Sequence, residues 1–255
     1  MLFADAALAR RVETAEAAVA RECSGRESDS LAIGGGIAVF AGAGSPLTQA
    51  VGLGMNGPVG ESEIAKLEEF FRTRGAAVKV EISPLADPQL IQTLGDRGYR
   101  VTEFNNVMVR RLDGFGAPEA PRVRRIRPAE NELWCHTVAA GFFDQSELSE
   151  DEMDIGRAIA AMPGVSCYLA WEFGARAAGA AMSVRSGLAC LFADSTVKAY
   201  RGRGLHRELI VARLSDALSQ GCDAATASTL PGSASQRNYE RLGFEVAYTR
   251  TTLVA

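Results

Sequence analysis

A run of glycine and proline near the middle of the chain constrains the fold more than any other feature of the sequence. Residues 113–121 read DGFGAPEAP, and the glycines and prolines in this run oppose both helix and sheet hydrogen bonding. The chain has 255 residues, which exceeds the ~100–200 of an ordinary domain. We therefore predict two domains, residues 1–112 and residues 122–255, joined by a linker over residues 113–121.

Both halves are expected to contain strands and helices in the same order. In the second half we predict strands from 123, at 167–171, 179–184, 188–193, 224–228 and 244–253, with helices near 133–142, 155–162, 205–219 and 233–242. In the first half we predict strands near 51–53 and 77–82 and helices at 61–72 and 88–94. Each half closes on a glycine and an aromatic residue, Gly98-Tyr99 and Gly243-Phe244. A mixed α/β sheet in two duplicated copies is predicted; the alternative is that such endings are ordinary in α/β proteins.

Composition excludes several classes of partner. The formal net charge is -4 and the pI is about 5.4, so the chain lacks the positive field that a nucleic acid needs. No apolar run approaches the ~20 residues that span a bilayer, and charged residues interrupt residues 1–22, which predicts an amphipathic helix. The five cysteines are scattered without a CxxC pair, which predicts reduced thiols, no metal site and a cytoplasmic protein.

The most informative stretch for chemistry is the turn YRGRGLHRELI at residues 200–210. It lies between a predicted strand and a predicted helix, where glycines let backbone N–H groups converge and the helix N-terminus adds positive potential. Arg201 and Arg203 can add bidentate hydrogen bonds to phosphate oxygens. The turn therefore predicts an anion-binding site; the alternative is a surface turn with solvated arginines.

Two motifs in this half resemble those of the GNAT acetyltransferase superfamily. The family's pyrophosphate signature is Arg or Gln, two residues, Gly, one residue, then Gly or Ala, and residues 201–206 here read RGRGLH. His206 stands where the family has a small residue. Residues 239–244, YERLGF, are similar to a Tyr-Glu-Lys-Leu-Gly-Phe pattern at the end of the family's last helix. The resemblance covers residues 123–255, and the duplication extends it to a degenerate N-terminal copy, giving tandem GNAT-like domains.

The resemblance implies an N-acetyltransferase that moves an acetyl or short acyl group from acyl-coenzyme A (acetyl-CoA) to a primary amine by direct attack. It implies that Tyr239 protonates the leaving thiolate and that a carboxylate accepts the proton of the amine, for which Asp194 is chosen over Glu172 or a chain of waters. The pantetheine arm is expected in a splay between the strand that ends near residue 197 and strand 224–228. The expected coenzyme-binding residues are Ser195, Thr196, Val197, Arg201, Gly202, Arg203, Gly204, Leu205, His206, Ser235 and Asn238.

Other assignments stay open at the level of sequence. The expected acceptor is a small-molecule or peptide amine. Three aromatic residues either border its site or lie in the core: Trp134, Phe142 and Phe143. The chain is expected to be a monomer or a homodimer. A non-catalytic acyl-coenzyme A sensor is the alternative function. Residues 52–57 match G-x-G-x-x-G, but Pro58 follows and no helix opens inside the motif, so a dinucleotide site is not predicted there.

Arginines cluster after the linker, at positions 122, 124, 125 and 127. We interpret this basic run as the solvated face of one strand.

Overall fold

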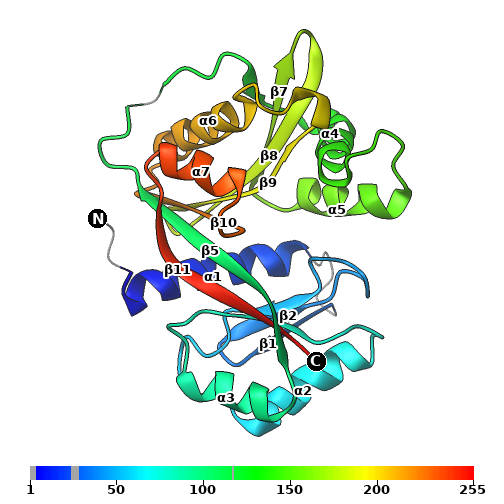
Figure 1. The fold of residues 1–255 in the computed structure, drawn as a ribbon, viewed down its shortest axis with the longest axis vertical. Coiled ribbons are helices and arrows are strands. Elements are labelled where there is room, and N and C mark those ends of the chain that lie inside the picture. The colour runs from blue at the N-terminus through cyan, green and yellow to red at the C-terminus, as the bar shows by residue number, and fades with distance from the viewer. Residues whose placement is uncertain (1–3, 24–28, 117) are drawn as a thin grey trace. The chain divides into compact units, whose positions relative to one another are not determined.

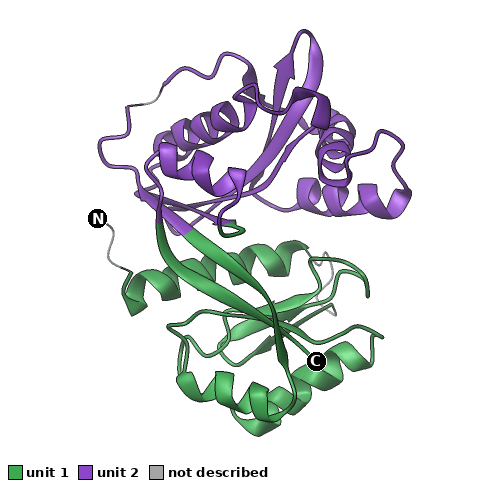
Figure 2. Cartoon of the chain, in the orientation of Figure 1, with its two compact units in different colours: residues 1–107, 229–231, 246–255 green, residues 108–228, 232–245 purple. Residues whose placement is uncertain are grey.

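The computed structural model describes residues 4–23, 29–116 and 118–255, and the chain divides into two compact units (Figures 1 and 2). Unit 1 comprises residues 1–107, 229–231 and 246–255, and unit 2 comprises residues 108–228 and 232–245. Residues 1–3 of the predicted first helix and residue 117 of the predicted linker lie outside the described residues. The last strand, expected at the end of the second half, thus lies mostly in unit 1.

In its described residues, unit 1 is a mixed sheet with three helices. Its elements are α1 (Ala6–Cys23), β1 (Ser30–Ile33), β2 (Gly36–Val39), β3 (Gln49–Val51), α2 (Glu61–Arg72), β4 (Lys79–Ile82), α3 (Pro88–Asp96), β5 (Arg100–Arg111) and β11 (Glu245–Val254). The strand order is β1-β2-β3-β4-β11-β5, so β11 lies between β4 and β5. Helix α2 buries Ile64, Leu67 and Phe71 at helical spacing, as the sequence predicted.

A buried ion pair fixes β11 within unit 1. Arg250 of β11 donates from Nε to Oε1 of Glu13 of α1 at 2.8 Å, and Tyr248 donates to the same oxygen at 2.7 Å. Arg250 also pairs with Glu16, and its side chain is 2% exposed. Burial opposes the charged form of Arg250, but the surrounding carboxylates raise its pKa well above the ordinary value. Removing one partner of such a pair is costly because the other charge stays buried.

Unit 2 has the elements that the second half of the sequence predicted, apart from the last strand. They are β6 (Val123–Arg125), the 3-10 turn η2 (Pro128–Glu130), α4 (Asn131–Phe143), α5 (Glu150–Ala161), β7 (Val165–Glu172), β8 (Ala175–Arg185), β9 (Leu188–Thr196), η3 (Lys198–Tyr200), α6 (Leu205–Ser219), β10 (Ala224–Thr229) and α7 (Ala234–Arg241). The strand order is β5-β10-β9-β8-β7-β6, in which β10 runs parallel to β9, and the three strands predicted at 167–171, 179–184 and 188–193 form an antiparallel meander, β7–β9.

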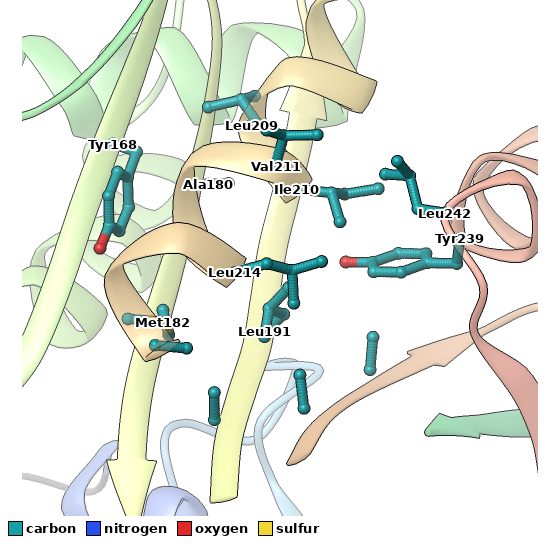
Figure 3. Close-up of a cluster of buried hydrophobic side chains, with 14 of the residues drawn as sticks. Tyr168, Ala180, Met182, Leu191, Leu209, Ile210, Val211, Leu214, Tyr239 and Leu242 are labelled. Atoms are coloured by element: carbon teal, nitrogen blue, oxygen red, sulfur yellow. The ribbon is translucent and has the colours of Figure 1, made fainter. Parts of the chain in front are cut away.

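The core of unit 2 forms between α6 and the sheet. Leu209, Ile210 and Leu214 of α6 are fully buried against Leu191 of β9, and Tyr239 reaches into the same cluster from α7 (Figure 3). Complete burial of a side chain of this size contributes roughly 1.5–3 kcal/mol. These buried side chains form an apolar stripe on the helix predicted at residues 205–219, whereas Leu218 near its end is exposed.

An irregularity in β9 shapes the end of that strand. Phe192 pairs with Ala181 and Ser195 with Gly179, so β9 contains one extra residue, and Ala193 adopts φ = +57°. The ladder between β9 and β10 reaches only from Leu188↔Ala224 to Leu191↔Ala227, whereas β9 continues to residue 196. The two parallel strands are therefore unpaired beyond this point, which is the splay that the resemblance implied.

The arginines that follow the linker form a solvated face only in part. Arg124, Arg125 and Arg127 are exposed, and Arg124 pairs with Glu130 and stacks over Trp171 at 4.5 Å. Arg122 departs from the interpretation because it donates to the carboxylates of Glu208 and Glu172 at 2.6 Å each, and these partners come from distant parts of the chain. Within the described residues, no helix combines the length and the apolar character that crossing a bilayer requires.

Candidate functional site

The glycine turn and the first turn of α6 form the centre of the candidate site. Gly202 and Gly204 have φ of +77° and +81°, a conformation that favours glycine. Gly204 is the N-cap of α6 and supplies no side-chain hydrogen bond to it. The first N–H groups of a helix have no partner inside the helix, so this end of α6 presents donors and positive potential.

Arg201, predicted to bind phosphate, makes hydrogen bonds within unit 2. It pairs through two nitrogens with Asp144, which ends α4 in a left-handed conformation, and donates to the carbonyl oxygens of Gly141 at 2.8 Å and Thr196 at 3.1 Å. Four of its five N–H donors are thereby used. In this structure Arg201 ties the end of β9 to the end of α4.

Arg203 of the same turn is more loosely held. Its guanidinium lies 3.8 Å from Glu172 and 5.5 Å from the ring centre of Phe173. Its side chain is 44% exposed, so it remains accessible to a ligand beside the glycine turn.

Asp194 is the centre of a buried hydrogen-bond cluster. Its Oδ1 pairs with a guanidinium nitrogen of Arg213 and with Nε2 of His206 at 3.1 Å, and its Oδ2 accepts from Arg213 at 3.2 Å and from Tyr239 at 2.9 Å. Asn238 lies 3.0 Å from Nδ1 of His206. The extra residue in β9 precedes Asp194, and in this strand Asp194 contacts α6 and α7 while Ser195 contacts α4.

The charges of this cluster are fixed by its contacts. Burial favours the neutral acid, but the Arg213 guanidinium and the hydrogen bonds from His206 and Arg213 outweigh it and hold the pKa of Asp194 well below its usual range. Burial and the Asp194 charge raise the pKa of Tyr239. A carboxylate with a lowered pKa and four donors is a poor proton acceptor at neutral pH, so these contacts do not favour the predicted role of Asp194 as the base.

A cavity of about 530 Å³ joins these features on one side of unit 2. It is lined by the end of β9, the glycine turn, the first turn of α6 and one face of α7. The predicted residues that line it are Asp194, Ser195, Thr196, Arg201, Gly202, Arg203, Gly204, Leu205, His206, Ser235 and Asn238. Val197 lines a neighbouring cavity, and Tyr239 lies behind the wall with 1% of its surface exposed.

The end of β9 offers one backbone donor toward the splay. The N–H of Val197 donates to the carbonyl of Ala177 in β8 at 2.9 Å. Successive N–H groups of a strand point to opposite edges, so the N–H of Thr196 faces the open edge. Ser195 Oγ instead donates to the carbonyl of Val138 at 2.7 Å, and a Cβ on Gly141 would lie 2.2 Å from that Oγ. Residue 141 must be glycine for α4 to approach β9 this closely.

His206 was the residue that departed from the family signature. Its ring is held by Asp194 and Asn238, and it packs edge-on against Tyr239 with ring centres 5.5 Å apart. It therefore turns toward the cluster and leaves the space over Gly202 open, where a Cβ would meet no atom within 4 Å.

Sequence reasoning missed three arginines of this site. Arg213 is fully buried on the apolar stripe of α6, between Leu209 and Leu214. A charged residue on a buried face requires a partner, so its position was a readable signal. Arg207 and Arg241 line the cavity, and among the described residues neither has an ion pair. Arg207 lies in the first turn of α6, and a basic side chain there is a signal that the sequence offered, whereas Arg241 ends α7 and had no such signal.

Of the aromatic residues proposed near the acceptor, Trp134 lies in the core. It is fully buried and donates from Nε1 to the carbonyl of Ala180 at 3.1 Å. Phe142 is 60% exposed and lines the cavity beside the glycine turn, and Phe143 is 43% exposed.

The corresponding helix start in unit 1 is filled by the chain itself. Helix α2 begins at Glu61, after the glycines of residues 52–57, so the dinucleotide motif lacks its helix, as predicted. The carboxylate of Glu63 accepts from the N–H of Gly60 at 3.0 Å and of Gly34 at 3.1 Å. These hydrogen bonds, from Gly60 first and then Gly34, lower the pKa of Glu63. The Glu63 carboxylate thus lies at the start of α2, whereas the start of α6 in unit 2 has no side-chain cap.

Comparisons with known proteins identify the fold. No protein-family model matches the chain, and no curated protein matches its sequence. A solved GCN5-related N-acetyltransferase from Kribbella flavida is 19% identical and superposes over 95% of each chain with a TM-score of 0.69. Another from Sphaerobacter thermophilus is 17% identical over 76% of this chain and 66% of that chain, with a TM-score of 0.59. A tandem GNAT protein from the clavulanic acid biosynthesis pathway is 16% identical over 82% and 74%, with a TM-score of 0.58.

The chain therefore has the mixed α/β fold of the GNAT N-acetyltransferases, as predicted. At this level of identity the likeness concerns the fold, and function has to be argued from the site.

Proposed function

We propose that the chain is an N-acetyltransferase that moves an acetyl or short acyl group from acyl-coenzyme A to a primary amine by direct attack. One observation carries the proposal: a single cavity joins a splayed strand edge, a glycine turn and the uncapped N-terminus of α6. The fold likeness supports an activity of this class. We propose a small-molecule or peptide amine as acceptor, a monomer or homodimer, and a cytoplasmic location with neither nucleic acid nor membrane as partner.

The residues of the cavity fit a pyrophosphate. The N–H groups from Gly204 into α6 would bind its oxygens together with Arg203, Arg207 and Arg241. The edge of β9 at Thr196 would hydrogen-bond the pantetheine arm, with Ser235 and Asn238 facing it from α7 (both line the same cavity). When bound, the coenzyme supplies an acyl thioester; the Thr196 N–H is a donor suited to polarise a carbonyl oxygen.

For the remaining residues we propose two kinds of role. Arg201 is a positioning residue that fixes the strand end through Asp144 and Thr196. Tyr239 remains the proposed proton donor to the leaving thiolate, and Asp194 positions its hydroxyl. Because that hydroxyl donates to Asp194 in this structure, it must exchange this acceptor for the sulfur during turnover.

Calorimetry with purified protein tests the coenzyme site. We expect acetyl-CoA to bind with a stoichiometry of one per chain and NAD not to bind. Arg207→Ala should weaken acetyl-CoA binding about tenfold through loss of a charge-assisted contact. The matched control is Arg72→Ala, which removes the same charge from an exposed site in unit 1. Absence of acetyl-CoA binding, or equal effects of the two substitutions, would contradict the proposal.

Thiol release with a panel of amines separates an enzyme from a sensor. The sensor hypothesis predicts acetyl-CoA binding without thiol release for any amine. Release that depends on the amine supports the transferase.

A further inference from the structure

Unit 2 has a second cavity, of about 1040 Å³. It borders the cavity of about 530 Å³ in which we propose that the coenzyme binds. Ala140 and Val197 line the second cavity, whereas the adjacent residues Gly141 and Thr196 line the first. The two cavities therefore meet at the ends of α4 and β9. An acceptor in the second cavity would lie next to the backbone donor of Thr196.

Two cations, Arg176 of β8 and Lys198 at the start of η3, border this second cavity. The N–H of Val197 donates to the carbonyl of Ala177, so Arg176 and Lys198 each lie next in the chain to one partner of this hydrogen bond. Both side chains line the cavity. Within the described part of the chain, neither has a carboxylate at ion-pair distance.

The other charges of the cavity are already balanced, with one exception. Glu130 is paired with Arg124, which lowers the pKa of Glu130 to about 2, and Asp144 is paired with Arg201. Glu147 is the carboxylate of the lining that has no ion pair among the described residues. The unpaired charges are thus two positive and one negative, which is complementary to a ligand with an oxyanion and an ammonium group.

We propose that the acceptor carries an oxyanion, a carboxylate or a phosphate, in addition to its amine, and that Arg176 and Lys198 bind this oxyanion. An anion bound between Arg176 and Lys198 makes charge-assisted hydrogen bonds with both. The apolar wall of the cavity, which includes Leu169 and Trp171, can take the carbon skeleton. This inference rests on the proposed function, whose amine acceptor it specifies.

Matched amines test the inference through thiol release from acetyl-CoA. Ethanolamine is compared with serine, which adds a carboxylate, and with phosphoethanolamine, which adds a phosphate; cadaverine is compared with lysine. We expect at least one anionic amine to exceed its neutral partner in kcat/KM by about tenfold or more, and the pair that does so identifies the oxyanion. Calorimetry of the same amines with the coenzyme-loaded protein gives a second readout of the preference.

Two variants assign the effect to the two cations. Arg176→Gln and Lys198→Met should each raise KM for the preferred anionic amine about five- to tenfold, while acetyl-CoA affinity and thiol release with the neutral amine stay unchanged. Arg72→Gln, an exposed arginine in unit 1, is the control and should change neither. Equal kcat/KM and equal binding within every pair, or an unchanged KM in both variants, overturns the inference. Failure of the proposed function differs from this, because acetyl-CoA would then not bind and no amine would release thiol.

Discussion

Replacing Asp194 by asparagine should destabilise unit 2 by about 3–5 kcal/mol, the cost of leaving one charge of a buried pair without its partner. The Arg213 side chain is fully buried, and Asp194 accepts hydrogen bonds from Arg213, His206 and Tyr239. Asparagine keeps one acceptor oxygen and brings an NH₂ group among these donors. The Arg213 charge would then be buried with only carbonyl oxygens of Ala181 and Leu209 as further partners.

Removing both charges should recover much of this loss. The double variant Asp194→Asn with Arg213→Met replaces the buried ion pair by neutral groups, which is often close to neutral for stability. Urea unfolding followed by tryptophan fluorescence reports unit 2 specifically, because both tryptophans, Trp134 and Trp171, lie in it. The single variant should lower the urea midpoint by more than about 1 M.

The pH dependence of the same measurement gives a second check. The pKa of Asp194 is lowered in the folded chain, so its ionised form stabilises the fold. That contribution is complete above the pKa of an unfolded aspartate, about 3.9, and is lost as pH falls through the lower folded value. The stability difference between the wild type and Asp194→Asn should be constant from about pH 5 to 8 and shrink below about pH 4.

A second aspartate serves as the control for the loss of stability caused by Asp194→Asn, because it is a carboxylate of unit 2 that has no buried arginine as partner among the described residues. Asp216 accepts a hydrogen bond from Tyr168 at 2.6 Å in the same unit, so Asp216→Asn should cost only about 1 kcal/mol. The reasoning is refuted if Asp194→Asn costs no more than Asp216→Asn. It is also refuted if the double variant is as unstable as the sum of its two single variants.

Three further predictions concern the site and its counterpart. Tyr239→Phe should lower kcat, measured by thiol release, by ~10²–10⁴-fold with acetyl-CoA affinity little changed. Tyr168→Phe, the same change away from the cavity, should leave kcat intact. A similar kcat in both variants contradicts the role of Tyr239 as the acid. Gly204→Ala and Gly221→Ala, both at positive φ on opposite ends of α6, should each cost about 1–2 kcal/mol in urea unfolding, and calorimetry should show weaker acetyl-CoA binding only for residue 204. Glu63→Gln keeps the size of the side chain and an acceptor oxygen for Gly60 or Gly34, so the stoichiometry should stay at one acetyl-CoA per chain by calorimetry; a second site would show that the charge of Glu63 alone excludes an anion from the start of α2.

Local patterns were sufficient to predict most of the elements. Helix α6 was predicted at residues 205–219 and has these bounds, because its apolar stripe and the glycine turn before it are local signals. The splay was predicted only from the family resemblance. In the structure it begins where the β9–β10 ladder ends, shortly before the extra residue at Ala193. That extra residue has no signal in the sequence, because alanine rarely adopts a positive φ.

The partners of charged residues could not be read from the sequence. Arg201 was expected to bind phosphate, but it pairs with Asp144, which lies 57 positions away in the chain. Asp194 was expected to accept the proton of the amine, but Arg213 and Tyr239 approach it from two helices and donate hydrogen bonds to it. Such pairings depend on which helices cover a strand end, and this is a property of the tertiary fold.

The position of β11 has a consequence for how the protein is made. Residues 246–255 belong to unit 1 but are translated after every residue of unit 2, and β11 lies between β4 and β5 in the sheet of unit 1. Domains usually fold in the order in which they leave the ribosome. Here unit 1 must wait, with Glu13 unpaired, until Arg250 has been added to the nascent chain. A ribosome that stops before residue 246 releases a chain in which unit 2 has its full sequence while unit 1 lacks an interior strand.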